Sequence, residues 1–150
     1  MSTSTGTPSP SLDEELNRLL GLFAEYQRLA ADGTSRTDLG ARVGRIGGRV
    51  QAIAQFEAES LLPLLGDAAL REEAGRQIED LRERVERLAE RSVDNERSDR
   101  GVAALAVALQ AHAQWLSRSA WPVLAEGDVE QLRAALGEAR ARWQQDEAPD

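Results

Sequence analysis

Two polar residues of the kinds that bind metal ions or transfer protons stand where apolar residues are expected. Glu57 lies four residues beyond Ile53 and continues a three-and-four spacing of apolar residues. His112, the one histidine of the chain, fills the same spacing between Leu109 and Leu116. We expect both side chains to face inward, where a carboxylate and an imidazole can hydrogen-bond, bind a metal ion or lean to the edge of the core. Because an unpaired buried charge is costly, a paired or boundary position is the simpler interpretation.

The elements that position these two residues are predicted to be helices. Aromatic residues are few, no run alternates between apolar and polar residues, and Ala, Leu, Arg, Glu and Gln dominate the composition. Gly33, Gly66 and Gly127 follow periodic segments and are expected to end them. The pattern predicts five helices, at about 11–31, 37–65, 67–92, 96–125 and from 128 onward.

Each predicted helix carries one apolar stripe that we expect to be buried. The stripes are Leu12, Leu16, Leu19, Leu20 and Phe23; Leu39, Val43, Ile46, Val50 and Ile53; Leu70, Ala74, Ile78, Leu81, Val85 and Leu88; Val102, Leu105, Leu109, Leu116 and Val123; and Leu132, Leu136, Ala139 and Trp143. The stretch 102–108 is apolar nearly all round, so we expect the fifth helix or a second subunit to cover it.

Short connections between long helices favour antiparallel neighbours. The predicted fold class is therefore all-α: an up-down-up-down four-helix bundle with a C-terminal fifth helix. We expect a disordered tail at 1–10, the bundle at 11–127, a helix at 128–145 packed on the bundle or on a partner, and a disordered tail at 146–150.

A short internal repeat supports two related helix pairs. The residues Ser60, Pro63 and Asp67 are echoed by Ser119, Pro122 and Asp128, with the first two pairs 59 residues apart. In a bundle with this repeat, the second and fourth helices occupy opposite corners. Glu57 and His112 are then expected within about one helical turn of the same level.

Composition excludes several classes of function. The 26 acidic and 18 basic residues leave a net charge of −8, which disfavours nucleic acid as a partner. No cysteine is present, so thiolate metal sites and cysteine nucleophiles are excluded. The longest apolar run, 102–109, is too short to span a membrane, and the N-terminus has no signal-peptide pattern. We expect a cytoplasmic protein that binds neither membranes nor nucleic acid.

The two proline-ended helices carry a family resemblance. The segment 56–65, with Glu57 six residues before Pro63, and the segment with His112 ten residues before Pro122 resemble the hemerythrin-like (HHE cation-binding) family. The resemblance implies a four-helix bundle with a di-iron site. In that family each of these helices carries a histidine ten residues before the proline and a carboxylate four or five residues later.

Transferred position by position, the resemblance implies that most iron ligands are missing. Ile53 stands at one histidine position, Leu116 and Ser117 stand at the carboxylate positions, and Gly75 and Asp13 stand where further histidines belong. Glu57 and His112 are the residual ligand-type residues. Two protein ligands are too few to hold iron against water, so we expect no metal and no cofactor.

These observations predict a non-catalytic binding or interaction module, with an unidentified protein partner or self-association. One alternative is a bundle that binds a small ligand or a single metal ion in the vacated core around Ile53, Glu57, His112 and Leu116. Another is a helical adaptor unrelated to the family that assembles through its fifth helix. No catalytic residue is predicted, because one histidine without a supporting motif completes no nucleophilic or acid–base constellation.

Overall fold

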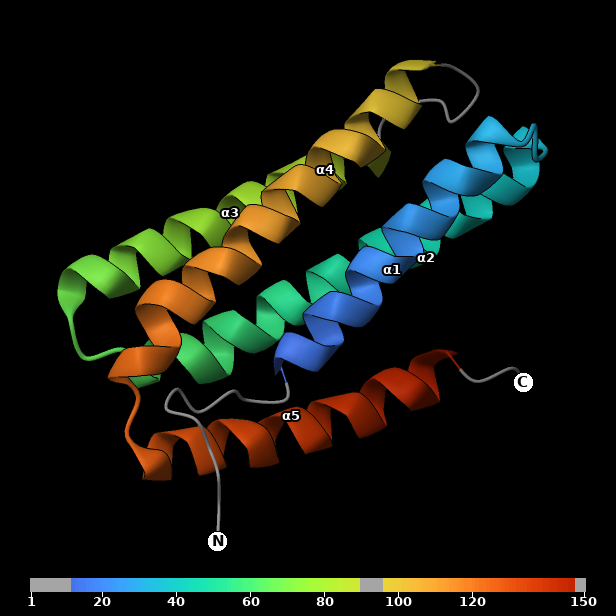
Figure 1. The fold of residues 1–150 in the computed structure, drawn as a ribbon. Coiled ribbons are helices and arrows are strands. Elements are labelled where there is room, and N and C mark those ends of the chain that lie inside the picture. Colours follow the sequence, from blue (N-terminus) through green and yellow to red (C-terminus); the bar gives the residue numbers. More distant parts are fainter. Residues whose placement is uncertain (1–11, 90–95, 148–150) are drawn as a thin grey trace, which may run out of the picture.

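The computed structural model describes residues 12–89 and 96–147, and this part of the chain contains helices and no strand. The five α-helices are α1 (Leu12–Ala31), α2 (Arg36–Phe56), α3 (Ala68–Ala89), α4 (Glu96–Trp115) and α5 (Glu126–Glu147) (Figure 1). The tail expected at 1–10 lies outside the described residues. Of the tail expected at 146–150, the first two residues belong to α5 and the last three lie outside the described residues.

Four helices pack side by side in a ring. Helix α1 packs on α2 and α4, and α3 packs on the same two helices, so α2 and α4 lie at opposite corners (Figure 1). The apolar stripes predicted for the first four helices line the inside of the ring, with three exceptions: Leu20 and Leu70 are half-buried and Val123 is exposed. No helix in the described ranges is long and apolar enough to cross a membrane.

The turn between α1 and α2 has a sequence-encoded stop and start. Gly33 has a φ of 81°, a left-handed conformation that glycine adopts without strain. Around it the Thr34 N–H donates to the Leu29 carbonyl at 3.1 Å and the Gly33 N–H donates to the Ala30 carbonyl at 3.3 Å, which is the Schellman pattern. Ser35 then caps α2 by accepting the Asp38 N–H at 3.2 Å.

Helices α2 and α4 end in the same irregular way, with Pro63 and Pro122 at matching places. A π-helical turn, η1 (Glu57–Leu61), follows α2 and leads into a 3₁₀ turn, η2 (Leu62–Leu64). The same succession follows α4, as η3 (Leu116–Ala120) and η4 (Trp121–Val123). Each element is displaced by 59 residues from its counterpart, so the internal repeat in the sequence is also a repeat in backbone geometry.

The π turn explains why Val123 was wrongly predicted to be buried. A π turn holds more residues than an α turn, so it shifts every later residue around the helix axis. After Leu116 the next buried side chains are Ala120 and Trp121, whereas Val123 is 57% exposed. Regular helical spacing does not apply across such a turn.

The boundary between the fourth and fifth helices also differs from the prediction. Leu124 has extended backbone angles and ends η4, and α5 begins at Glu126. The Val129 N–H donates to the Ala125 carbonyl at 3.0 Å, which places Gly127 inside the first turn of α5. Gly127 is therefore not a helix stop, because the break at Leu124 already reverses the chain.

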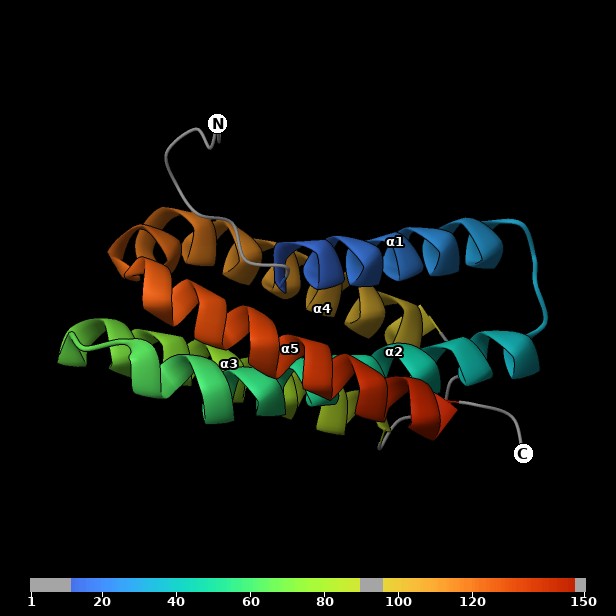
Figure 2. The same cartoon turned by 90° about the horizontal axis from the view of Figure 1, so that it is seen from below.

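Helix α5 lies outside the ring and crosses it on the side of α2 and η1 (Figure 2). Its predicted stripe faces the bundle: Leu132, Leu136 and Ala139 are buried and Trp143 is half-buried. The apolar stretch of α4 is not its docking surface, since Val107 remains 68% exposed. The expectation that α5 covers this stretch is corrected.

Candidate functional site

Glu57 and His112 meet in the centre of the ring. Glu57 is the first residue of η1 and is 1% exposed, and His112, three residues before the end of α4, is 2% exposed. The His112 Nε2 atom lies 2.7 Å from the Glu57 Oε1 atom. The prediction that both side chains face inward is confirmed, and the two bridge opposite corners of the bundle.

The second ring nitrogen of His112 is also engaged. Its Nδ1 atom lies 2.7 Å from the Gln77 Oε1 atom on α3, and the Gln77 Nε2 atom donates to Glu73 at 2.8 Å. Because the amide nitrogen of Gln77 faces a carboxylate, its oxygen must accept from His112. This chain of contacts places a proton on Nδ1. The ring of Trp115 stacks on the imidazole, with centroids 6.5 Å apart.

With Nδ1 protonated, one further proton must lie between Glu57 and His112. Without it, a lone pair on Nε2 and a carboxylate oxygen would face each other at 2.7 Å. The proton belongs either to a neutral carboxyl group or to an imidazolium, and the pair has no net charge in both forms. Glu57 Oε2 is buried and has no hydrogen-bond partner among the described residues.

The residues around this pair do not fit a di-iron centre. Both nitrogens of His112 are occupied by protein contacts, and the other two ligand positions of these helices hold buried apolar side chains, those of Ile53 and Leu116. Asp13 accepts a hydrogen bond from Trp121 Nε1 at 2.9 Å. Across residues 12–89 and 96–147, no group of three or more His, Cys, Asp or Glu residues is arranged to hold a metal ion.

One of the four candidate pocket residues, His112, lines a cavity. His112 borders a cavity of about 450 Å³ between α3 and α4, whose lining does not include Ile53, Glu57 or Leu116. The charged residues at this cavity are paired along α3, with Arg76 to Glu73 at 2.7 Å and Arg84 to Asp80 at 2.8 Å.

A second buried carboxylate, Glu15, was not predicted from the sequence. It is 2% exposed and is met by arginines from three helices. Glu15 Oε2 accepts from Arg140 Nε on α5 at 2.5 Å and from Arg18 at 2.9 Å, and Oε1 lies 3.6 Å from Arg49 on α2. Arg49 also lies over the ring of Trp143 at 5.5 Å, so charge and cation–π contacts together dock α5.

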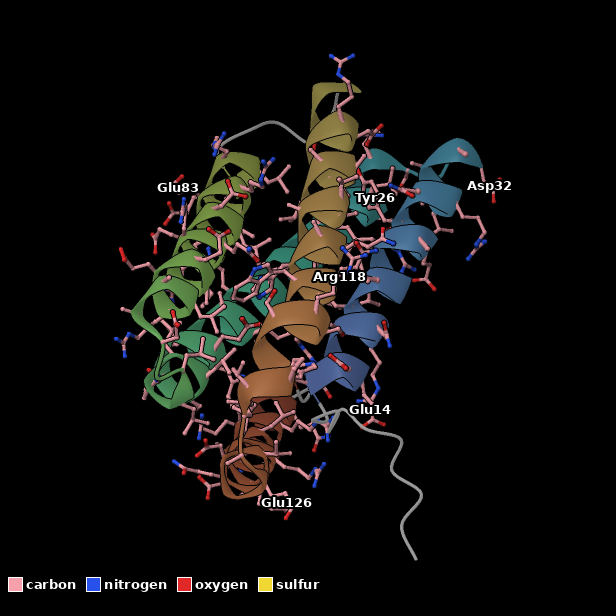
Figure 3. The ribbon with its side chains drawn as sticks, turned by 60° about the vertical axis from the view of Figure 1, so that its left-hand side comes forward. Glu14, Tyr26, Asp32, Glu83, Arg118 and Glu126 are labelled. Carbon is pink, nitrogen blue, oxygen red and sulfur yellow. The ribbon has the colours of Figure 1, made fainter. Side chains whose placement is uncertain are left out.

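A third polar cluster links α1, α2 and α4 at the other end of the ring. The Tyr26 hydroxyl donates to Asp99 Oδ1 at 2.6 Å, and Arg36 donates to both Asp99 oxygens at 3.0 and 3.3 Å. Tyr26 projects from α1 toward α4 (Figure 3). Burial, together with the bond to Asp99, raises the pKa of Tyr26 to about 12. The hydrogen bonds from Arg36 and then from Tyr26 lower the pKa of Asp99.

The sequence carries a partial signal for one of these residues. Glu15 lies three residues after Leu12 and four before Leu19, so it shares their side of α1. Gln77 immediately precedes the stripe residue Ile78, and nothing in its spacing marks it as buried or functional.

Comparison of the chain with protein-family models, with curated proteins and with solved structures found no match.

Proposed function

We propose that the chain is an up-down-up-down four-helix bundle of the hemerythrin-like type whose di-iron site has degenerated, and that it acts as a non-catalytic binding or interaction module. The ring order α1, α2, α3, α4 and the short turn between α1 and α2 support this topology. The observation that carries the proposal is the full occupation of His112, whose two nitrogens both contact protein oxygens at 2.7 Å.

The 59-residue repeat explains how such a site degenerates. It aligns Ile53 with His112 and Glu57 with Leu116, so each half of the repeat keeps one ligand-type residue and replaces the other by an apolar one. The two retained residues satisfy each other across the core. A histidine with both nitrogens engaged has no free lone pair for a metal ion or for proton transfer to a substrate.

The proposed partner is a protein, a second copy of the chain or a small molecule. The net charge of −8 argues against nucleic acid. The described acidic and basic side chains around the cavity at His112 are already paired with each other, and this supports a surface other than that cavity as the binding site.

Metal analysis tests this proposal. Protein purified from iron-supplemented cells should contain well under one iron per chain and show no absorption band of an oxo-bridged di-iron centre. The matched control is His112→Gln, which removes the one imidazole and should leave the metal content unchanged. About two irons per chain in the wild type, lost in His112→Gln, would overturn the proposal.

A further inference from the structure

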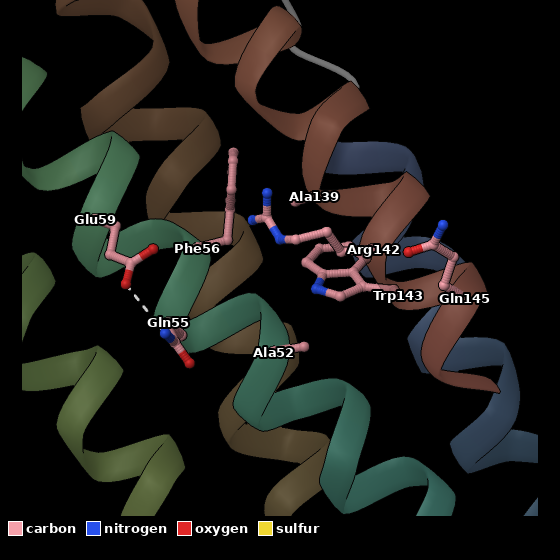
Figure 4. A pocket seen from close by; sticks show the side chains of 8 residues that line it. All are labelled: Ala52, Gln55, Phe56, Glu59, Ala139, Arg142, Trp143 and Gln145. Atoms are coloured by element: carbon pink, nitrogen blue, oxygen red, sulfur yellow. Dashed lines mark hydrogen bonds between the residues drawn. The ribbon is translucent and has the colours of Figure 1, made fainter.

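A cavity of about 350 Å³ separates α2 from the C-terminal part of α5 (Figure 4). This volume lies within the range of sites that bind small molecules. Its lining combines two aromatic rings, those of Phe56 and Trp143, with the small side chain of Ala139 and with polar groups at the rim. It is separate from the cavity that His112 borders.

The aromatic wall of this cavity is fixed by packing. The rings of Phe56 and Trp143 meet edge to face, with centroids 6.4 Å apart and an interplanar angle of 84°. Arg49 lies over the Trp143 ring, and Arg49 is itself held by Glu15. Both rings are therefore oriented before any ligand arrives, which reduces the entropy lost on binding.

The cation at this cavity is Arg142. Its side chain reaches from α5 toward Phe56 on α2 (Figure 4), and within the described residues it makes no ion pair or hydrogen bond. The carboxylate of the rim, Glu59, accepts a hydrogen bond from Gln55 Nε2 at 3.0 Å, on the α2 side. A guanidinium presents paired N–H donors that match the two oxygens of a carboxylate.

We propose that this cavity binds a small aromatic carboxylate, with its ring against Phe56 and Trp143 and its carboxylate on Arg142. The inference rests on the proposed function, because it names the ligand class of that binding module. Phe56 directly precedes the π turn η1, and Glu59 lies within it. Insertions of this kind are frequent at functional sites, and here the turn places one carboxylate, Glu57, in the core and another at the cavity rim.

Three probes with the same ring and chain length separate the contribution of the aromatic ring to binding from that of the charge: 3-phenylpropanoate, 3-phenylpropanamide and 3-phenylpropylamine. The readout is the indole N–H signals of the three tryptophans in nitrogen-15 NMR spectra of the full chain. We expect 3-phenylpropanoate to shift the Trp143 signal saturably. The Trp121 signal, whose N–H is bound to Asp13, should stay fixed. The amide should bind about tenfold more weakly, because it lacks the charge that Arg142 recognises.

The test variant is Arg142→Gln and its matched control is Arg133→Gln, which alters an exposed arginine of the same helix that pairs with Glu130. We expect Arg142→Gln to weaken binding of 3-phenylpropanoate about tenfold and Arg133→Gln to leave it unchanged. Both positions are exposed, so circular dichroism should show the same helical fold for both variants.

Three results would overturn the proposal: no shift of the Trp143 signal at about 10 mM 3-phenylpropanoate, equal binding of the amine, or unchanged binding in Arg142→Gln. Equal binding of the amine would assign the ionic contact to Glu59. Iron content measured on the same sample keeps this failure apart from failure of the proposed function. An iron-free protein that binds no probe refutes only the ligand class, whereas an iron-loaded protein refutes the degenerate site.

Discussion

The two buried carboxylates, Glu57 and Glu15, are stabilised in opposite ways. Each is at most 2% exposed. Glu57 lies in the centre of the ring, where one shared proton with His112 leaves the pair without net charge. Glu15 lies where α5 crosses α1 and α2, and three guanidinium groups surround it. The side chains of these three arginines are 23–68% exposed, so their charges stay partly hydrated, which is feasible only at the edge of the bundle.

Removing α5 should have the largest effect, because it removes a partner of Glu15 and leaves the pair of Glu57 and His112 intact. Deleting 126–150 removes Arg140 and the buried residues Val129, Leu132 and Leu136. We expect the free energy of unfolding to fall by about 5 kcal/mol, or the protein to aggregate through the exposed face. Urea unfolding and size-exclusion chromatography measure the two effects. A truncated chain that stays soluble, equally stable and in the same oligomeric state would contradict docking of α5 as described.

His112→Leu removes the hydrogen-bond partner of Glu57 in the centre of the ring. It leaves both oxygens of Glu57 buried without a partner and should lower the free energy of unfolding by about 3 kcal/mol. The double variant Glu57→Leu/His112→Leu removes both polar groups at similar volume, so we expect it to be more stable than His112→Leu alone.

A double-mutant cycle with Glu57→Leu gives the coupling free energy of the pair from urea unfolding. If the two single changes added up to the effect of the double change, the side chains would not act as a hydrogen-bonded unit.

Arg140→Met tests whether Arg18, Arg49 and Arg140 each stabilise part of the buried charge of Glu15. Arg18 and Arg49 remain in place, so we expect a loss of only about 1 kcal/mol, seen as a fall of about 2–4 °C in melting temperature. The control Arg133→Met removes an exposed pair with Glu130 and should change little. A loss as large as that of His112→Leu would show that Glu15 depends on Arg140 alone.

The cluster of Tyr26, Arg36 and Asp99 should give the smallest effect, because Asp99 and Arg36 are each about one-third exposed. The pKa of Asp99 is lowered in the folded state, so its contribution is present above the unfolded pKa of about 3.9 and is lost as pH falls through the folded value. We expect Asp99→Asn to cost about 1 kcal/mol or less at pH 7, with the difference in melting temperature closing in acid. A difference independent of pH would contradict the ion pair.

The same cluster predicts an effect in alkali with the opposite sign. The pKa of Tyr26 is raised from 10 to about 12, so its contribution is full below pH 10 and is lost as pH rises through about 12. Tyr26→Phe should abolish this alkaline loss in a series of melting temperatures against pH. An unchanged alkaline loss in the variant would assign it to another group.

The sequence was sufficient where one helix determines its own inner face. Regular spacing along α2 and α4 placed Glu57 and His112 in the core, because His112 lies within α4 and Glu57 is the first residue after α2, before the π turn η1 has shifted the spacing. Spacing failed at Val123, which follows a π turn. Spacing also did not predict the burial of Glu15, because that burial depends on where α5 docks. The contact between Gln77 and His112 was not predicted either, because it forms only where α3 packs on α4.

The most direct test of the account is nitrogen-15 NMR of the one imidazole, that of His112, with and without metal. We predict a spectrum with Nδ1 protonated and a proton between Nε2 and Glu57, unchanged by stoichiometric zinc or ferrous iron. The matched variant Glu57→Gln should alter the Nε2 signal and leave the Nδ1 proton in place, since Gln77 still accepts it. A stoichiometric shift of the wild-type imidazole signals by zinc, or their broadening by ferrous iron, would contradict the closed pair and restore a metal site.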